Sequence, residues 1–389
     1  MSNTLTAIIP TLQDAAYVVG RELVGFVPAC FKNTSANRAG YNQTVNYPIV
    51  PALTAAAVTP TNVAPSGTDI TQGADSIIMD QLRKVSWNWT GEERRALSNG
   101  DIAPYQEIIG QTLQQAMRTL VNEIENSLWV AAYKGASRAY GTAGTAPFGT
   151  ASDLSDFANV ARILDDNGAP ELDRHCVVGA AAMANLRGKQ SVLFKVNEAG
   201  TSDTLRRGSI GEVMGFMVHN SYPITTVTAG TNSGGTTDSA GYALKATSLT
   251  LASAGTGTLL AGDVVALTGD ASAAKYVLKS GDTDVSNGGS FVLNAPGLQG
   301  TLSAATHAIT TTATSTRNIA FQRQGLHLVM RAPDNGDDAA IDTVNVQDPM
   351  SGLVFQLARY GQYMQSSFEL RVLYGVKATN PHLIAVLLG

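Results

Sequence analysis

The sequence predicts an α+β protein in which a β-rich segment interrupts a larger domain. Two observations carry this prediction. Apolar residues recur mostly at steps of three and four from Pro104 to Tyr133, which indicates one long helix. Between Thr225 and Arg317 more than half the residues are Thr, Ser, Gly or Ala, with few charges. Because a dense apolar pattern resumes at Asn318 and runs to the C-terminus, the segment is predicted to be a guest within a host domain.

Length and charge bound the protein class. A chain of 389 residues corresponds to roughly two to three domains. The formal net charge of -5, with no tract of clustered Lys and Arg, argues against a protein whose main task is binding nucleic acid. Cys30 and Cys176 are too few for a disulfide framework and match no metal or redox motif, so we expect both to be buried apolar fillers.

Residues 1–39 are predicted to form an arm. One short amphipathic helix is expected before Gly20 or Gly25, and polar residues follow it. The arm has too few apolar residues to fold alone. No basic patch precedes an apolar run here, and charged residues interrupt the apolar stretches, so we expect neither an export signal nor a membrane span.

Residues 40–90 are predicted to form a long β-hairpin. Apolar and polar residues alternate from Gln43 to Leu53, and a second extended run covers Ser76 to Trp89. The stretch between them, Thr54–Ala74, is almost uncharged and predicts an open tip. Such a projection leaves unpaired backbone and apolar side chains unless another chain covers them. Trp87 and Trp89 share one face of the second strand, where core packing and a subunit interface remain two open interpretations.

The long helix is expected to begin near Asp101 and Pro104 and to end before Gly135. Asp101 offers a capping side chain, and a proline in the first turn loses no hydrogen bond. About thirty residues of helix would span about 45 Å. Only one side is apolar, and Gly110 interrupts the pattern, so we expect a core-facing helix and not a coiled coil.

Residues 141–224 show a mixed pattern. We predict a helix at Leu154–Leu164, a strand at His175–Val178, a helix at Ala180–Arg187 and a strand starting at Phe216. Glycines before Phe216 are expected to permit tight turns.

Within residues 225–318 the pattern predicts short strands at Ala246–Leu251, Asp263–Leu267, Tyr276–Leu278 and Ser290–Leu293. Their spacing and the turn residues between them favour a small barrel or sandwich. Disorder is the alternative, because Thr, Ser and Gly bury little surface. The clustered apolar residues of these runs favour a folded unit.

No motif for enzymatic chemistry is present: we find no nucleophile elbow, zinc-protease helix, Walker loop or dinucleotide fingerprint. We therefore predict no enzyme, and no catalytic, cofactor-binding or metal-binding residues. The histidines lie singly in the sequence, at His175, His219, His307, His327 and His382. The acidic run from Asp334 to Asp338 lacks the spacing and terminal Glu of a calcium loop. Gly208, Gly211 and Gly215 do not lie between a strand and a helix as a phosphate loop requires.

The order of several residue groups resembles the P22-like coat protein family of tailed bacteriophages, whose members have the HK97-like capsid fold. The groups are Gly208, Ile210, Gly211, Gly215, Phe216, Ser221 and Pro223, then Asn318-Ile319-Ala320-Phe321 with Arg323, Arg331 and Pro333, and finally Asp348, Ser351-Gly352-Leu353, Leu373-Tyr374-Gly375 and Asn380-Pro381. The resemblance covers nearly the whole chain.

The resemblance implies a domain layout. It consists of an N-terminal arm at 1–39, an extended loop at 40–90, a peripheral domain with a spine helix at 91–140, an axial domain at 141–224, a β-rich insertion domain at 225–318, and a return to the axial and peripheral domains at 319–389. In the family the extended loop lies across a neighbouring subunit. Related insertion domains can project a charged loop, whereas Ala229–Gly241 offers only Asp238.

The resemblance also implies function: a major capsid protein that self-associates through hexamers and pentamers into an icosahedral shell around double-stranded DNA. The partners it implies are copies of the chain, a scaffolding protein, a portal and decoration proteins, with DNA enclosed without sequence-specific binding and no membrane. The location implied is the virion, after assembly in the cytoplasm of a host bacterium. A Thr- and Gly-rich surface-layer or adhesin-type protein is the alternative, and a hydrolase with an accessory β domain is a third.

Overall fold

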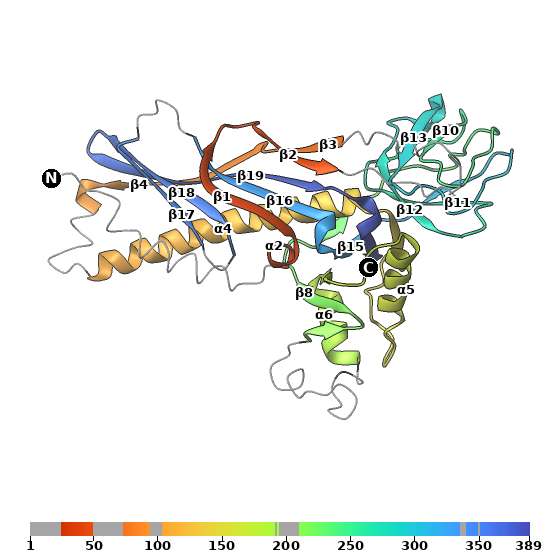
Figure 1. Ribbon diagram of the computed structural model, residues 1–389, viewed down its shortest axis with the longest axis horizontal. Helices are drawn as coiled ribbons and strands as arrows, with labels where there is room; N and C mark the ends of the chain where they lie inside the picture. The colour runs from red at the N-terminus through yellow and green to blue at the C-terminus, as the bar shows by residue number, and fades with distance from the viewer. Residues whose placement is uncertain are drawn as a thin grey trace, which may run out of the picture.

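The computed structural model describes residues 25–49, 73–93, 103–190, 193, 210–334, 340–348 and 351–389. They form a mixed α+β fold, as predicted, in which two large sheets share one long helix, α4 (Ala103–Gly135). In Figure 1 this helix runs along the first sheet, and its C-terminal end reaches the second. The predicted helix from Pro104 to Tyr133 is therefore confirmed, with one or two more residues at each end.

The first sheet has six strands. In spatial order five of them are β1 (Phe31–Ala39), β16 (Leu326–Pro333), β19 (Gln365–Ala378), β18 (Val354–Gln362) and β17 (Asp342–Gln347), and β4 (Gln81–Thr90) also pairs with β19. Only β1 is parallel to its neighbour. No strand is predicted within the arm from the sequence, because β1 is mostly polar and shows no alternation. Its parallel backbone pairing with β16 makes it a strand. The helix expected before Gly20 or Gly25 lies outside the described residues.

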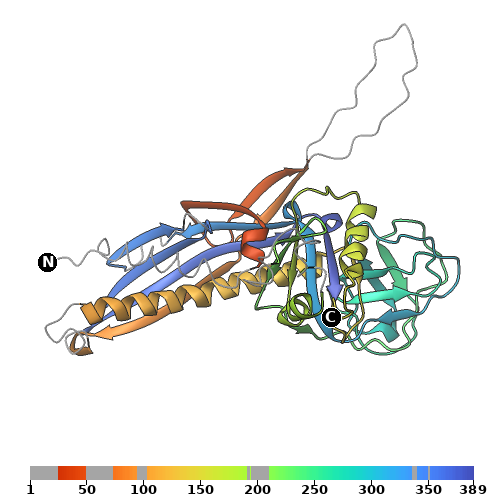
Figure 2. The ribbon, with the colours of Figure 1, turned by 90° about the horizontal axis from the view of Figure 1, so that it is seen from below.

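The hairpin is formed by β2 (Thr44–Ile49) and β3 (Gly73–Ile78), which pair antiparallel. Figure 2 shows these strands rising from one side of the first sheet. The prediction of one extended run from Ser76 to Trp89 was wrong. The strand β3 ends before Met79, and the next strand, β4, pairs with β19 instead. Met79 is buried, and its backbone exchanges hydrogen bonds with Asn42 and Gln43 at 3.0 Å each. Residues 50–72, which include most of the predicted open tip, lie outside the described residues.

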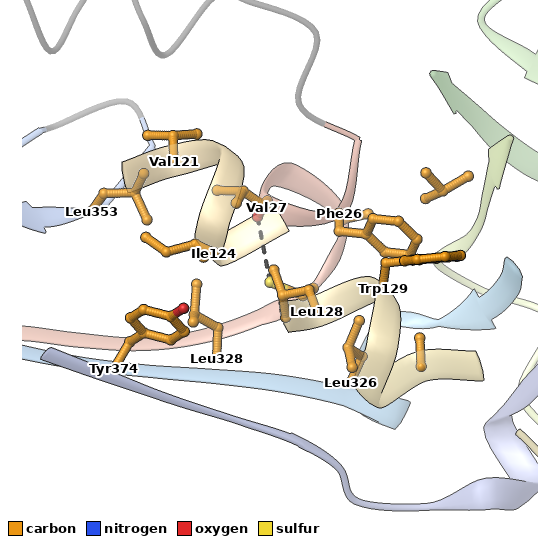
Figure 3. Packing of buried hydrophobic residues seen from close by; sticks show 14 of the residues in the cluster. Phe26, Val27, Val121, Ile124, Leu128, Trp129, Leu326, Leu328, Leu353 and Tyr374 are labelled. Atoms are coloured by element: carbon orange, nitrogen blue, oxygen red, sulfur yellow. Dashed lines mark hydrogen bonds between the residues drawn. The ribbon is translucent and has the colours of Figure 1, made fainter. Parts of the chain in front are cut away.

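One face of α4 forms the main hydrophobic core. Its fully buried side chains include Leu113, Met117, Leu120, Ile124, Leu128 and Ala132. Figure 3 shows part of this packing, in which α4 meets the N-terminal helix α2 (Phe26–Ala29) and strands of the first sheet. Each fully buried Leu, Ile or Met contributes about 1.5–3 kcal/mol of transfer free energy, so this stripe stabilises the packing of both sheets on α4.

The second sheet has twelve strands and is centred on β15 (Ser315–Gln322). Its host strands are β5 (Arg138–Tyr140), β20 (Ile384–Leu388), β6 (Arg174–Val178), β8 (Phe216–Asn220) and β7 (Glu212–Val213). The helices α5 (Ser155–Asp166) and α6 (Ala180–Lys189) contribute to a second hydrophobic cluster against these strands. The predicted elements of this region are present, each with its ends within two residues.

Residues 225–318 are folded, so the disorder alternative is wrong. They supply β9 (Thr226–Val227), β10 (Ser248–Leu251), β11 (Val264–Leu267), β12 (Lys275–Ser280), β13 (Gly289–Leu293) and β14 (Ile309–Thr311) to the second sheet. Buried residues such as Tyr276, Leu278 and Phe291 form a separate apolar cluster. All four predicted strands are present. The segment is joined to the host, because β12 pairs with β5.

Gly375 should be required where β19 passes beneath the end of β3. A Cβ atom added there would lie 2.2 Å from the carbonyl oxygen of Ile78, and backbone cannot move aside cheaply. We expect Gly375→Ala to lower the free energy of unfolding by about 1–3 kcal/mol in urea titrations. The control is Gly188→Ala on the exposed side of α6, where nothing lies within 4 Å of the added atom and about 0.5–1 kcal/mol of stabilisation is expected. Equal effects of the two substitutions would contradict the crossing described.

Candidate interaction surfaces

The described residues show no arrangement suited to holding a metal ion. No group of three or more His, Cys, Asp or Glu among them has the geometry of a metal site. No helix in the described part of the chain is long and apolar enough to cross a membrane. That the chain has no catalytic or cofactor-binding residues stays a prediction.

The five histidines lie singly in the sequence, but the fold brings two of them together. His175 Nδ1 lies 3.1 Å from His219 Nε2, and His175 Nε2 lies 3.0 Å from Asp173 Oδ1. Parallel pairing of β6 with β8 brings the two rings together from positions 44 residues apart, a distance that local sequence patterns do not bridge. Arg323 completes the group through its Nε, 3.2 Å from Asp173 Oδ2.

This histidine pair is built for the neutral state. One hydrogen bond between two ring nitrogens needs one donor and one acceptor, so two fully protonated rings cannot keep it. Burial lowers the pKa of His175, and burial with the neighbouring His175 and Arg323 charges lowers the pKa of His219 to about 4. The pair joins β6 to β8.

Both cysteines are buried and free, as predicted. Desolvation raises the pKa of Cys30 and of Cys176 to about 12, so neither thiol is available as a thiolate near neutral pH.

Glu125 is a buried carboxylate on α4 that ties the N-terminal segment to the helix. Its oxygens accept hydrogen bonds from the backbone N–H of Phe26 at 3.1 Å and of Val27 at 2.8 Å, and from Ser221 Oγ at 2.8 Å. Only 1% of the residue is exposed. Because desolvation dominates over these bonds, the pKa of Glu125 is raised.

Sequence reasoning missed Glu125, although a signal was present. The residue lies four positions after Val121 and eight after Met117, on the apolar stripe of the helix. A carboxylate on such a stripe must find buried donors, and here two of them are backbone groups at the start of α2.

The residues that carry the family resemblance fix turns and contacts between distant elements. Asn318 accepts a hydrogen bond from Gly179 N at 2.8 Å and donates one to Leu387 O at 3.1 Å, which links β15 to the turn after β6 and to β20. Tyr374 Oη lies 2.9 Å from Ser127 Oγ and joins β19 to α4. Gly211 and Gly215, with φ of 65° and 79°, form the turns around β7 as expected, and Gly208 lies outside the described residues.

The residues of the resemblance in the loop after β17 also fix a turn. The backbone N–H of Ser351 donates to Asp348 Oδ2 at 2.9 Å, and that of Gly352 donates to Asp348 O at 2.8 Å. Lys32 Nζ reaches Ser351 O at 2.8 Å, so this loop also holds the start of β1.

The two tryptophans of β4 show core packing, and the interpretation as a subunit interface stays a prediction. Trp87 and Trp89 pack against the main core, and the Trp87 ring stacks on Phe368 with centroids 5.9 Å apart. Both side chains remain partly exposed. Within the described residues β4 pairs only with β19, so it forms an edge of the first sheet.

Other apolar side chains are exposed in groups near turns. Tyr363 is 91% and Met364 67% exposed at the turn between β18 and β19. A second group, Tyr41, Ile78 and Leu82, surrounds the base of the hairpin. Large exposed side chains that cluster in this way are typical of surfaces that contact other chains.

Comparison with solved structures identifies the fold. The chain is similar to one in the capsid of the cyanophage P-SCSP1u, with a TM-score of 0.50 and 12% identity over 95% of this chain and 88% of that one. It also matches a chain from the bacteriophage PhiM1 mature capsid, with a TM-score of 0.46 and 13% identity over 94% of this chain and 86% of that one. A chain from Mycobacterium phage Che8 matches with a TM-score of 0.45 and 14% identity over 89% of this chain and 84% of that one. No protein-family model matches the sequence, and no curated protein is significantly similar to it. The likeness to the cyanophage chain shows a shared fold.

Loss of the Glu125 carboxylate should destabilise the fold. We expect Glu125→Ala to lower the free energy of unfolding by about 3 kcal/mol or more, since three buried donors lose their acceptors at about 1–3 kcal/mol each. Glu125→Gln keeps one acceptor oxygen and should lose less. Glu123→Ala, which removes an exposed carboxylate from the same helix, should stay within about 0.5 kcal/mol. Urea unfolding measures all three, and a Glu125→Ala variant as stable as the Glu123→Ala control would contradict the anchoring role.

The histidine pair should make stability depend on pH. Because the folded state holds the pKa of His219 near 4, against 6.5 for the free side chain, the unfolded chain binds more protons between these values. The free energy of unfolding should therefore fall as the pH is lowered from about 6.5 towards 4. His219→Gln, which retains a donor for His175, should flatten this slope in unfolding curves taken across that range. An unchanged slope would contradict the assignment.

Proposed function

We propose that the chain is the major capsid protein of a tailed double-stranded DNA bacteriophage and acts as a structural building block without enzymatic activity. The observation that carries the proposal is the similarity of fold to a chain of the cyanophage P-SCSP1u capsid across 95% of this chain. The sequence resemblance to the P22-like coat proteins is independent support, since its residues fix turns and long-range contacts in this fold.

We further propose the HK97-like layout for the chain. Its parts are an arm at 1–39, an extended loop at 40–90, a peripheral domain at 91–140, an axial domain at 141–224, an insertion domain at 225–318 and a return at 319–389. In this layout α4 is the spine helix, and β2 and β3 are the base of the extended loop. The separate apolar cluster of residues 225–318 supports treating them as an inserted unit.

Self-association accounts for the exposed surfaces. The β4 edge with its partly exposed indoles, the Tyr363–Met364 turn and the apolar group at the hairpin base all need partners. In a closed shell every subunit is held by several neighbours at once, so each contact needs only modest free energy. We propose hexamers and pentamers of this chain as the assembling units.

The remaining partners follow from the same proposal. A scaffolding protein and a portal would act during assembly in the bacterial cytoplasm, decoration proteins would bind the mature virion, and the shell would enclose DNA without reading its sequence. The net charge of -5 suits a container, because a strongly basic inner wall would hold DNA and hinder its release.

Expression of the chain with and without a scaffolding protein tests the proposal. We expect large closed shells, detected by size-exclusion chromatography and negative-stain electron microscopy. A well-behaved monomer under all conditions would rule the proposal out, whereas open sheets or filaments would favour the surface-layer alternative.

A further inference from the structure

A cleft of about 740 Å³ lies where residues 225–318 meet the host domain. It opens beside the short pairing of β5 with β12, which covers only Arg138, Ala139, Lys275 and Tyr276. Side chains from β5, α5, the turn before β12 and Gln299 line it. Because β5 and β12 stop pairing there, the cleft lies at the boundary between residues 225–318 and the rest of the second sheet.

The lining is positively charged. Arg138, Arg162 and Lys275 face one carboxylate, Asp166, which leaves an excess of positive charge in a chain whose net charge is -5. Asp166 is already used, since its Oδ2 lies 3.3 Å from both terminal nitrogens of Arg138. The cleft therefore holds two cations that no carboxylate neutralises.

The two remaining cations have no counter-charge among the described residues. Lys275 Nζ donates to the carbonyl oxygen of Gly141 at 2.6 Å and has no acidic partner among the described residues. Burial lowers the pKa of Lys275, so its charge has lost water without gaining a counter-charge. Arg162 is exposed, and no hydrogen bond or ion pair joins it to another described residue. Arg138 Nε is buried without a hydrogen-bond partner in the described part of the chain.

This arrangement calls for an incoming anion, and a carboxylate fits it better than a nucleic-acid backbone. A protein that binds a chain of phosphates needs a row of cations, whereas the lining of this cleft has three cations and one carboxylate, Asp166. A carboxylate presented by a protein surface would pair with Lys275 and Arg162 together. An acidic chain that meets copies of itself supplies such carboxylates on every neighbour.

We propose that this cleft is an interface site that receives an Asp or Glu side chain of a second copy of the chain. The inference rests on the proposed function, because it takes many copies to be packed side by side. It assigns residues 225–318 a share in subunit contacts through the seam at Lys275, in addition to any effect on the stability of the subunit.

Zero-length cross-linking of mixed shells tests the site. Shells assembled from equal amounts of ¹⁴N-labelled and ¹⁵N-labelled chain are treated with a carbodiimide, which joins a lysine to a carboxylate in direct contact. We expect peptides in which Lys275 is linked to an Asp or Glu of the other isotope, and their absence from unassembled chain. In parallel, Arg162→Glu should lower the yield of shells at least tenfold, while Arg187→Glu, the same charge change at an exposed position of α6, should not.

The outcomes separate the two proposals. Shells that form normally with Arg162→Glu and carry no mixed-isotope link at Lys275 would overturn the interface site and leave the capsid function standing. If inorganic phosphate protects Lys275 of unassembled chain from a reagent that acylates lysine, and shells carry no link at Lys275, the cleft would be a small-anion site. Protection seen only in DNA-filled shells would assign it to nucleic acid, and both results overturn the inference. Wild-type chain that never forms shells would instead reject the proposed function.

Discussion

The apolar stripe of α4 is the constraint on which the rest of the structure depends. A helix of 33 residues is long enough to lie beneath the first sheet and still reach β15, β20 and β12 of the second. Buried residues of both sheets pack against its apolar stripe. Because the hydrophobic effect is not directional, the apolar stripe stabilises the packing but does not fix the position of each strand along α4. Other groups must fix these positions.

Buried polar groups provide that definition. Glu125 fixes the start of α2 at one point of the helix, and Trp129 Nε1 donates to Arg317 O at 2.9 Å, which sets β15 against it. Near the helix end, Asn294 Nδ2 donates to Lys134 O at 2.8 Å and to Ala136 O at 2.7 Å, and so holds residues 225–318. Each bond adds little net stability, but a shifted arrangement would leave the same groups unpaired in the interior.

Much of the fold could be predicted because its signals are local. The long helix α4, the helices that begin near residues 155 and 180, and the strands of residues 225–318 follow from apolar spacing and turn residues. β1 could not be predicted, since most of its side chains are polar and only parallel pairing with β16 makes it a strand. The predicted run ends at Met79 because Met79 bonds to the turn before β2, which is a non-local contact. The contact between His175 and His219 likewise depends on the parallel pairing of β6 with β8. The cleft at Lys275 is equally non-local, because its cations come from elements far apart in the chain.

The pairing of β9 with β15 has a consequence for how this protein can change over evolution. Thr226 lies opposite Thr316 and Val227 opposite Ser315, so the two ends of the long segment leave the host side by side. Because lengthening a loop costs little extra closure entropy, the residues between β9 and β15 can vary in number at little cost in stability. The second attachment at β5 limits this freedom. Without β12 one edge of β5 would be unpaired, so we expect sequence changes in this segment to keep a strand at that edge.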